Sequence, residues 1–161
     1  MVSSERPRAG MVIPPGHGES LDLGRTVPRV LLAGDDCGGH LAVLETMQPA
    51  GGGPPLHTHT HEDESFYVLA GEFTFVCGEV SLEAVAGSFA HLPRGVPHRY
   101  FAGPDGGRLL MLFTPSGMEN YFREWAGLVA AGEMTDSAME ALATHHGLRL
   151  LGAYGRDSSQ P

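Results

Sequence analysis

Between residues 29 and 114 the sequence repeats one pattern, a short run of aliphatic, aromatic or β-branched residues followed by a turn. The 161-residue chain holds 23 Gly and 12 Pro, and these residues favour turns over long helices. Short strands at such close spacing predict an all-β domain, an antiparallel sandwich or barrel. Between two of the runs, Ala70, Gly71 and Glu72 are typical of a tight hairpin turn. Strands are expected at residues 29–33, 41–47, 66–69, 73–76, 80–84, 88–92, 99–101 and 109–114.

The pattern changes after Pro115, where apolar residues recur at helical spacing. Residues 118–130 place Tyr121, Phe122 and Trp125 on one face of a predicted helix. These aromatic side chains are expected to dock the helix on the barrel rather than to clamp a substrate.

Capping residues mark the starts of two C-terminal helices. Ser116 and Glu119 fit a capping box, and Thr135 fits the N-cap of a second helix that ends near residue 145. Residues 148–151 form either a last strand or a docked apolar tail. The chain is therefore divided into an N-terminal arm (1–27), a barrel (28–115), C-terminal helices packed on the barrel (116–152) and a tail (153–161).

The composition restricts the partners and the compartment. A formal net charge of -9 and a sequence pI near 5.3 argue against nucleic acid or an anionic membrane as a partner. No apolar run approaches the roughly 18 residues of a membrane span, and the N-terminus lacks the apolar segment of a signal peptide. Cys37 and Cys77 are too few for a disulfide framework. We expect two reduced thiols in a cytoplasmic protein.

Residues 51–71 carry a group of potential metal ligands. His57 and His59 are two residues apart, so on a strand they face the same side, about 6 to 7 Å apart. Glu64 would face the opposite side of one continuous strand, so residues 60–63 must form a turn, and Glu64 begins a returning antiparallel strand. His61 competes as a ligand, because it shares the parity of the two histidines, but the turn favours Glu64.

A second stretch supplies a further imidazole. The turn at residues 93–97 would direct His98 into the same interior. Three imidazoles and one carboxylate suit a divalent ion of Fe, Mn, Ni, Co, Cu or Zn. Four protein ligands on an octahedral ion leave two positions open, which suits binding of O₂ or substrate better than a closed structural site does.

These two stretches resemble the two motifs of the cupin superfamily. The first, G-x5-H-x-H-x3,4-E-x6-G, is matched by Gly51, His57, His59, Glu64 and Gly71. The second, G-x5-P-x-G-x2-H-x3-N, is matched by Gly87, Pro93, Gly95 and His98, with Ala102 in place of the family's final Asn, which is not a metal ligand. The resemblance extends over residues 28–114. It implies an antiparallel cupin β-barrel (a double-stranded β-helix or jelly roll), here with a short C-terminal α-helical segment.

The sequence around the motifs is similar to that of small single-domain cupins likened to quercetin 2,3-dioxygenase. The resemblance implies a catalytic role for Glu64, which could take a proton from a substrate hydroxyl; a purely structural ligand is the alternative. Phe66 and Val68 share the parity of Glu64, and Tyr100 shares that of His98. These three side chains are expected to line a substrate pocket, with ordinary core packing as the alternative.

Other polar residues near the motifs have simpler interpretations. Glu62 and Asp63 are expected to be solvated carboxylates of the turn. His40 and His91 are expected to face outward. No inward Arg or Lys is evident beside the motifs, which favours an aromatic or polyketide-like ligand over a sugar phosphate.

Three functions fit this set of residues. The first is a metal-dependent dioxygenase that brings O₂ to a flavonol-like, aromatic or dicarbonyl small molecule. The second is an O₂-independent isomerase, cyclase or lyase that uses the metal as a Lewis acid. The third is a non-catalytic small-molecule-binding cupin, against which the four intact ligands count. A homodimer is expected, because pairing protects sheet edges, and the N-terminal arm could exchange between subunits.

Overall fold

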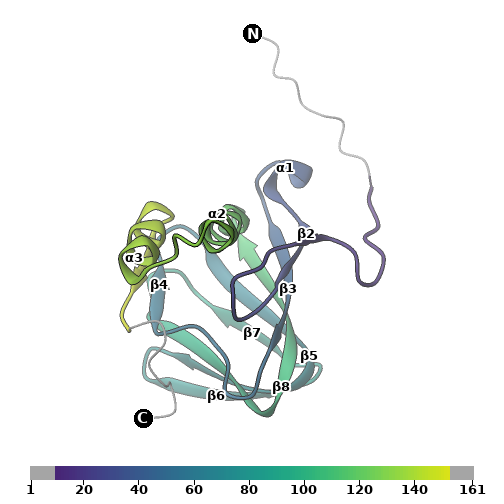
Figure 1. Cartoon of the computed structure of the whole chain (residues 1–161). Helices are drawn as coiled ribbons and strands as arrows, with labels where there is room; N and C mark the ends of the chain where they lie inside the picture. The colour runs from purple at the N-terminus through teal and green to yellow at the C-terminus, as the bar shows by residue number, and fades with distance from the viewer. Residues whose placement is uncertain (1–9, 153–161) are drawn as a thin grey trace.

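The strands form one antiparallel system with two helices at one end (Figure 1). The computed structural model describes residues 10–152. Within them lie the strands β1 (Glu19–Ser20), β2 (Arg29–Leu32), β3 (Ala42–Gln48), β4 (His57–His59), β5 (Asp63–Cys77), β6 (Val80–Val85), β7 (Phe89–Leu92), β8 (His98–Thr114) and β9 (Leu148–Leu150). The helices are α1 (Gly34–Cys37), α2 (Met118–Ala131) and α3 (Asp136–His145).

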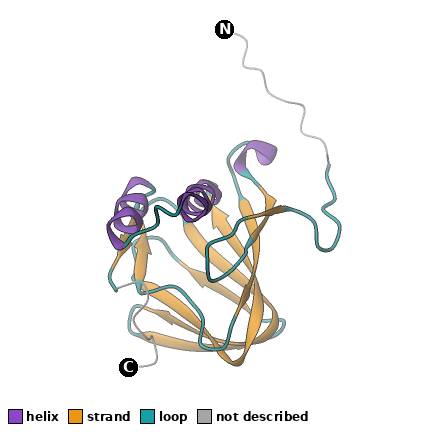
Figure 2. Ribbon diagram, viewed as in Figure 1, coloured by secondary structure: helices purple, strands orange, loops and turns teal. Residues whose placement is uncertain are grey.

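The strand β8 joins the two halves of the structure. It pairs along its length with β5 and also with β3 and β4, while β5 in turn pairs with β6 and β7. All of these pairings are antiparallel, although hydrogen bonds do not close the sheet into a complete ring. Figure 2 shows the strands wrapped around one interior, with the helices gathered at one end of it. The predicted antiparallel cupin fold with a C-terminal helical segment is confirmed.

Two predicted pairs of strands are single long strands, so the predicted hairpin at Gly71 is wrong. The runs 66–69 and 73–76 both belong to β5, and the runs 99–101 and 109–114 both belong to β8. Gly71 has a φ of 81°, and the pairing of β5 with β8 shifts register on either side of it. A Cβ at Gly71 would meet the backbone of Gly106 and Gly107. Glycine therefore bends two closely apposed strands here rather than reversing one of them.

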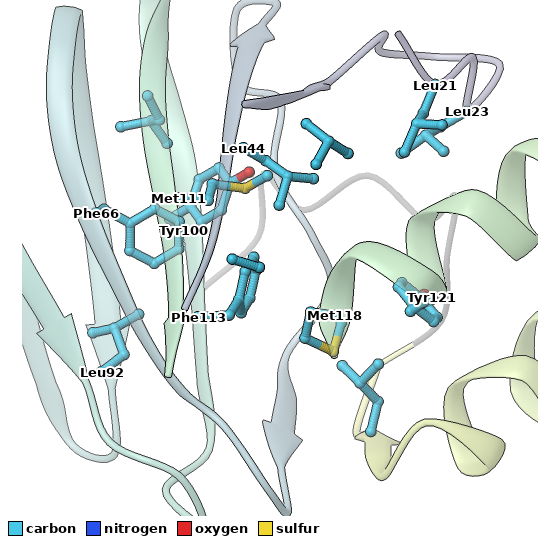
Figure 3. Packing of buried hydrophobic residues seen from close by; sticks show 14 of the residues in the cluster. Leu21, Leu23, Leu44, Phe66, Leu92, Tyr100, Met111, Phe113, Met118 and Tyr121 are labelled. Carbon is cyan, nitrogen blue, oxygen red and sulfur yellow. The ribbon is translucent and has the colours of Figure 1, made fainter. Parts of the chain in front are cut away.

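The interior is filled by alternate residues of the long strands. Phe66, Phe75 and Tyr100 are buried and pack with ring centroids 5.0 to 5.9 Å apart. Phe113 on β8 and Met118 on α2 continue this core toward the helices (Figure 3). The alternation follows from the period of two in a β-strand, which sends every second side chain inward.

The C-terminal helices begin differently. In α3, Thr135 is the N-cap and accepts a hydrogen bond from the Ala138 N–H, as predicted. In α2 the predicted capping box is wrong, because Gly117 is the N-cap and makes no side-chain cap. The buried Glu119 instead accepts hydrogen bonds from the backbone N–H groups of Gly117 and Gly34, at 2.7 and 2.8 Å. Glu119 thus ties α2 to the start of α1.

Both ends of the described chain add strands to the sheet. Residues assigned to the arm form β1, which pairs with β2. Of the two alternatives for residues 148–151, the strand is present as β9, which pairs with β4. The tail at 153–161 and the first nine residues of the arm lie outside the described residues. The homodimer stays a prediction that the molar mass in solution would measure, and the cytoplasmic location also stays a prediction. No helix within residues 10–152 is long and apolar enough to cross a membrane.

Candidate metal centre

Three strands bring the predicted ligands together. His57 and His59 lie on β4, Glu64 follows the first residue of β5, and His98 begins β8. The strand β4 pairs with β8, where His57 stands opposite His98, and with β9. It does not pair with β5, so the predicted hairpin between the histidines and Glu64 is wrong. The intervening turn crosses from one half of the structure to the other, and both halves direct these side chains into the interior.

The four donor atoms form a compact cluster. The Nε2 atoms of His57 and His59 are 3.2 Å apart. The Oε2 atom of Glu64 lies 3.1 Å from His98 Nε2, 3.4 Å from His59 Nε2 and 3.8 Å from His57 Nε2. All four residues are buried, and one donor atom from each lies within 4.8 Å of the others.

These separations fit a common transition-metal ion. Donors about 2.1 Å from one ion stand about 3.0 Å apart at a right angle and about 3.4 Å apart at a tetrahedral angle. The four measured separations, 3.1 to 3.8 Å, lie close to that range. Three imidazoles and one carboxylate, without sulfur, match several divalent ions and select no single one.

In His57 and His98, the hydrogen-bond partner of Nδ1 determines that Nε2 is the nitrogen that faces the cluster. The Nδ1 atoms of His57 and His98 lie 2.8 Å from the carbonyl oxygens of Pro55 and Val96, respectively. A carbonyl can only accept, so each Nδ1 carries the proton and each Nε2 offers its lone pair to the interior.

His59 has a different neighbour. Its Nδ1 atom lies 3.6 Å from the Oε2 atom of Glu62. The prediction that Glu62 is a solvated turn carboxylate is wrong, because its side chain is buried. Sequence parity could not show this, since a turn has no fixed alternation. Asp63 does lie at the surface, where Arg94 donates to it through its backbone N–H and its guanidinium.

The charges within the cluster balance one another. Burial would raise the pKa of Glu64, but the imidazoles of His57, His59 and His98 hold it well below its usual range. Burial would lower the pKa of His59, but the carboxylates of Glu62 and Glu64 raise it to about 9. Burial lowers the pKa of His57. At neutral pH and without a metal, the ionised Glu64 therefore lies beside the protonated imidazole of His59.

A cavity of about 510 Å³ opens onto this cluster. That volume is within the usual range for small-molecule sites. Its wall combines three of the clustered residues, polar groups of β3 and β8, and one face of α2. The lining includes His57, His59, Glu64, Thr46, Gln48, Tyr100, Tyr121, Phe122 and Trp125.

The predicted pocket residues lie in two different environments. Tyr100 lines the cavity, and its hydroxyl accepts a hydrogen bond from Gln48 Nε2 at 3.1 Å. Burial raises the pKa of Tyr100, so its phenol stays protonated. Phe66 and Val68 point inward as predicted, but both are fully buried and do not line the cavity. Their proposed place in the pocket wall is wrong, because Phe66 packs between Phe75 and Tyr100.

The sequence did not predict several residues of the cavity wall. Tyr121, Phe122 and Trp125 dock the helix, yet they also form one wall of the cavity. Arg25 lines the cavity as well, although no inward cation was expected near the motifs. The only sequence signal for the aromatic wall is their shared helical face, and no sequence signal joins Arg25 to the site.

The competing histidines are placed elsewhere. His61 is exposed and is not a member of the cluster. His91 faces outward on β7, where its Nδ1 lies 2.9 Å from the hydroxyl of Ser65. Within residues 10–152, one other set of potential ligands stands together, the mainly exposed Glu124, His145 and His146 of the C-terminal helices.

Comparison with known proteins agrees with this geometry. Residues 43–114 match the cupin domain family, a stretch that contains both motifs and all four clustered residues. Residues 43–114 are therefore a cupin domain. Among solved structures, the chain resembles an RmlC-like cupin from Shewanella frigidimarina NCIMB 400, with a TM-score of 0.57, 24% identity and coverage of 70% of this chain and 98% of that one. It also resembles KdgF from Halomonas sp., with a TM-score of 0.61, 16% identity and coverage of 70% and 99%. These two likenesses show the fold alone.

One curated relative carries an activity in its name. Quercetin 2,3-dioxygenase of Bacillus subtilis (strain 168) is 26% identical to this chain over 112 residues. The match covers 70% of this chain and 33% of the relative, so the chain spans about a third of the relative's length.

The protonated imidazole of His59 predicts how metal binding depends on pH. A metal needs the lone pair that the proton occupies, so affinity should rise with pH from about 6.5 to about 9. Over the same interval the metal-free protein should lose stability, because a raised histidine pKa stabilises the folded state fully only below the unfolded value. Calorimetric titration in buffers of different ionisation enthalpy should detect release of about one proton per metal at neutral pH. Binding enthalpies that do not depend on the buffer would contradict this.

Proposed function

We propose that this cupin is a metal-dependent dioxygenase that acts on a flavonol-like, aromatic or dicarbonyl small molecule. The observation that carries the proposal is the position of the cavity. It opens directly onto His57, His59 and Glu64 and has an aromatic wall on the side of α2. The likeness to the Bacillus quercetin 2,3-dioxygenase supports the choice of reaction.

The four clustered residues would hold a divalent transition metal. The bound ion would supply a positive charge beside an enolate or phenolate oxygen and open positions for exogenous ligands. The chain's own residues have separate tasks. Glu64 is the one carboxylate among the described residues that line the cavity, so it is placed to take the proton of a substrate hydroxyl.

Polar and aromatic groups would orient the substrate. Gln48 donates to the oxygen of Tyr100, so the Tyr100 hydroxyl proton remains available to a substrate oxygen. Tyr121, Phe122 and Trp125 offer flat apolar surfaces on which a ring can pack. Arg25 adds a cation to the lining, which favours a substrate that carries negative charge when it reaches the metal.

Oxygen uptake tests the reaction class. Metal-depleted protein would be reconstituted separately with Fe, Mn, Ni and Co and mixed with a flavonol in a closed oxygen-electrode cell. We expect uptake of about one O₂ per flavonol consumed, with at least one metal, and none with the metal-free protein. Turnover that continues under argon would instead indicate an O₂-independent isomerase, cyclase or lyase. Binding of the flavonol without turnover, for every metal, would indicate a small-molecule-binding cupin.

A further inference from the structure

Beside the Nδ1 atom of His59 lies a buried carboxylate that the proposed reaction does not use. Glu62 is 6% exposed, yet it belongs to the short turn between β4 and β5. It is absent from the cavity lining, so it cannot touch a substrate there. Burial of a carboxylate is costly unless a partner offsets the lost hydration.

The partner of Glu62 is an imidazole of the cluster. Within the described residues, three buried side-chain atoms lack a hydrogen bond, and two of these are His59 Nδ1 and Glu62 Oε2. These two atoms face each other at 3.6 Å. The contact would have to shorten by about half an ångström to become a hydrogen bond. Arg94, the cation beside this turn, is engaged by Asp63 instead.

The three imidazoles therefore differ in the chemical group that their Nδ1 atoms face. Those of His57 and His98 each lie 2.8 Å from a neutral backbone carbonyl, and that of His59 faces a carboxylate. A carboxylate behind a ligating imidazole fixes the tautomer and raises the basicity of the other nitrogen. It also places a second negative charge, after Glu64, against an imidazole of the cluster.

The loop before α2 holds the carboxylate in this place. A Cβ on Gly117 would come within 3.2 Å of Glu62 Oε1, so the chain packs closely over this side chain. Gly117 has a φ of 145°, a conformation that favours glycine. The loop before α2 thus covers one side of Glu62, and its Oε2 atom faces His59 Nδ1 on the other.

We propose that Glu62 is a positioning residue, which accepts a hydrogen bond from His59 Nδ1 when a divalent metal is bound and thereby strengthens metal binding. The proposal rests on the metal centre of the proposed function but on neither its substrate nor its use of O₂. Since metal binding can be measured without turnover, failure of the dioxygenase assay would leave this proposal intact.

The test compares Glu62→Gln with Asp63→Asn. Both substitutions remove one negative charge and keep the side-chain shape, but the Asp63 carboxylate points outward to Arg94. Dissociation constants for Co²⁺ would be measured by chelator competition near pH 9, where protons compete least with the metal. We expect Glu62→Gln to weaken binding by about 10- to 100-fold and Asp63→Asn to change it by less than about threefold.

Two further readouts separate positioning from a general structural role. The visible absorption bands of bound Co²⁺ should shift in Glu62→Gln, because the basicity of one ligand changes, and should stay unchanged in Asp63→Asn. Circular dichroism should show that metal-free Glu62→Gln keeps the wild-type fold, so that weaker Co²⁺ binding cannot be assigned to unfolding. Unchanged Co²⁺ affinity in Glu62→Gln would overturn the proposal, as would equal weakening in the two variants.

Discussion

Replacement of His98 with alanine is expected to lower the affinity for a divalent metal by roughly 100- to 1000-fold. Binding of a metal by four such ligands releases on the order of 10 kcal/mol or more, so the loss of one ligand removes about a quarter of it. His98 is 1% exposed, and its Nε2 lies 3.1 Å from Glu64 Oε2.

The matched control is His91→Ala. This histidine lies on β7 and faces outward, hydrogen-bonded to Ser65, so its loss should leave metal content unchanged. Both variants would be saturated with metal, passed through a desalting column and measured by elemental analysis, with circular dichroism as a check on folding. Equal metal content in the two variants would show that His98 is not a ligand.

Replacement of Glu64 with glutamine is expected to reduce turnover by about 10²- to 10⁴-fold while much of the metal is retained. The reduction is the usual contribution of a positioned general base. Metal should stay because three imidazoles remain and the amide oxygen can occupy the place of the carboxylate oxygen. The neighbouring Asp63→Asn, which removes an outward carboxylate, should leave turnover near the wild-type value.

Full turnover by a metal-loaded Glu64→Gln protein would show that Glu64 is a structural ligand and not a general base. Turnover and metal content must therefore be measured on the same preparation. The pH profile adds an independent check. The pKa of Glu64 is held well below its usual range by the imidazoles, so it should stay ionised, and turnover should not fall through protonation of this group in mildly acidic solution.

The part of the site that the sequence predicts is the part that strand alternation controls. The parity of His57 and His59 places both on one face of β4, and the odd spacing of Glu64 requires the break that separates β4 from β5. The turn before His98 directs it to the same interior, which is why the four donors meet. These relations are local, and each depends on only a few neighbouring residues.

The remainder depends on contacts between segments distant in sequence. The sequence predicts a hairpin turn at Gly71, but the position of Gly71 opposite Gly106 and Gly107 makes it a bend within β5. The docking of α2 over the open end of the sheet decides that Trp125 lines the cavity and that Glu62 is covered. Arg25 reaches the same cavity from the N-terminal arm. Apart from the helical face that Trp125 shares with the other aromatic residues of α2, none of these placements has a local sequence pattern.

The central claim is that His57, His59, Glu64 and His98 together hold one transition-metal ion. Crystals of the metal-saturated protein, measured at the absorption edge of that metal, test it most directly. We predict one anomalous peak about 2.0 to 2.3 Å from the three Nε2 atoms and a carboxylate oxygen of Glu64. The absence of a peak there, or a single peak at Glu124, His145 and His146 instead, would contradict the account.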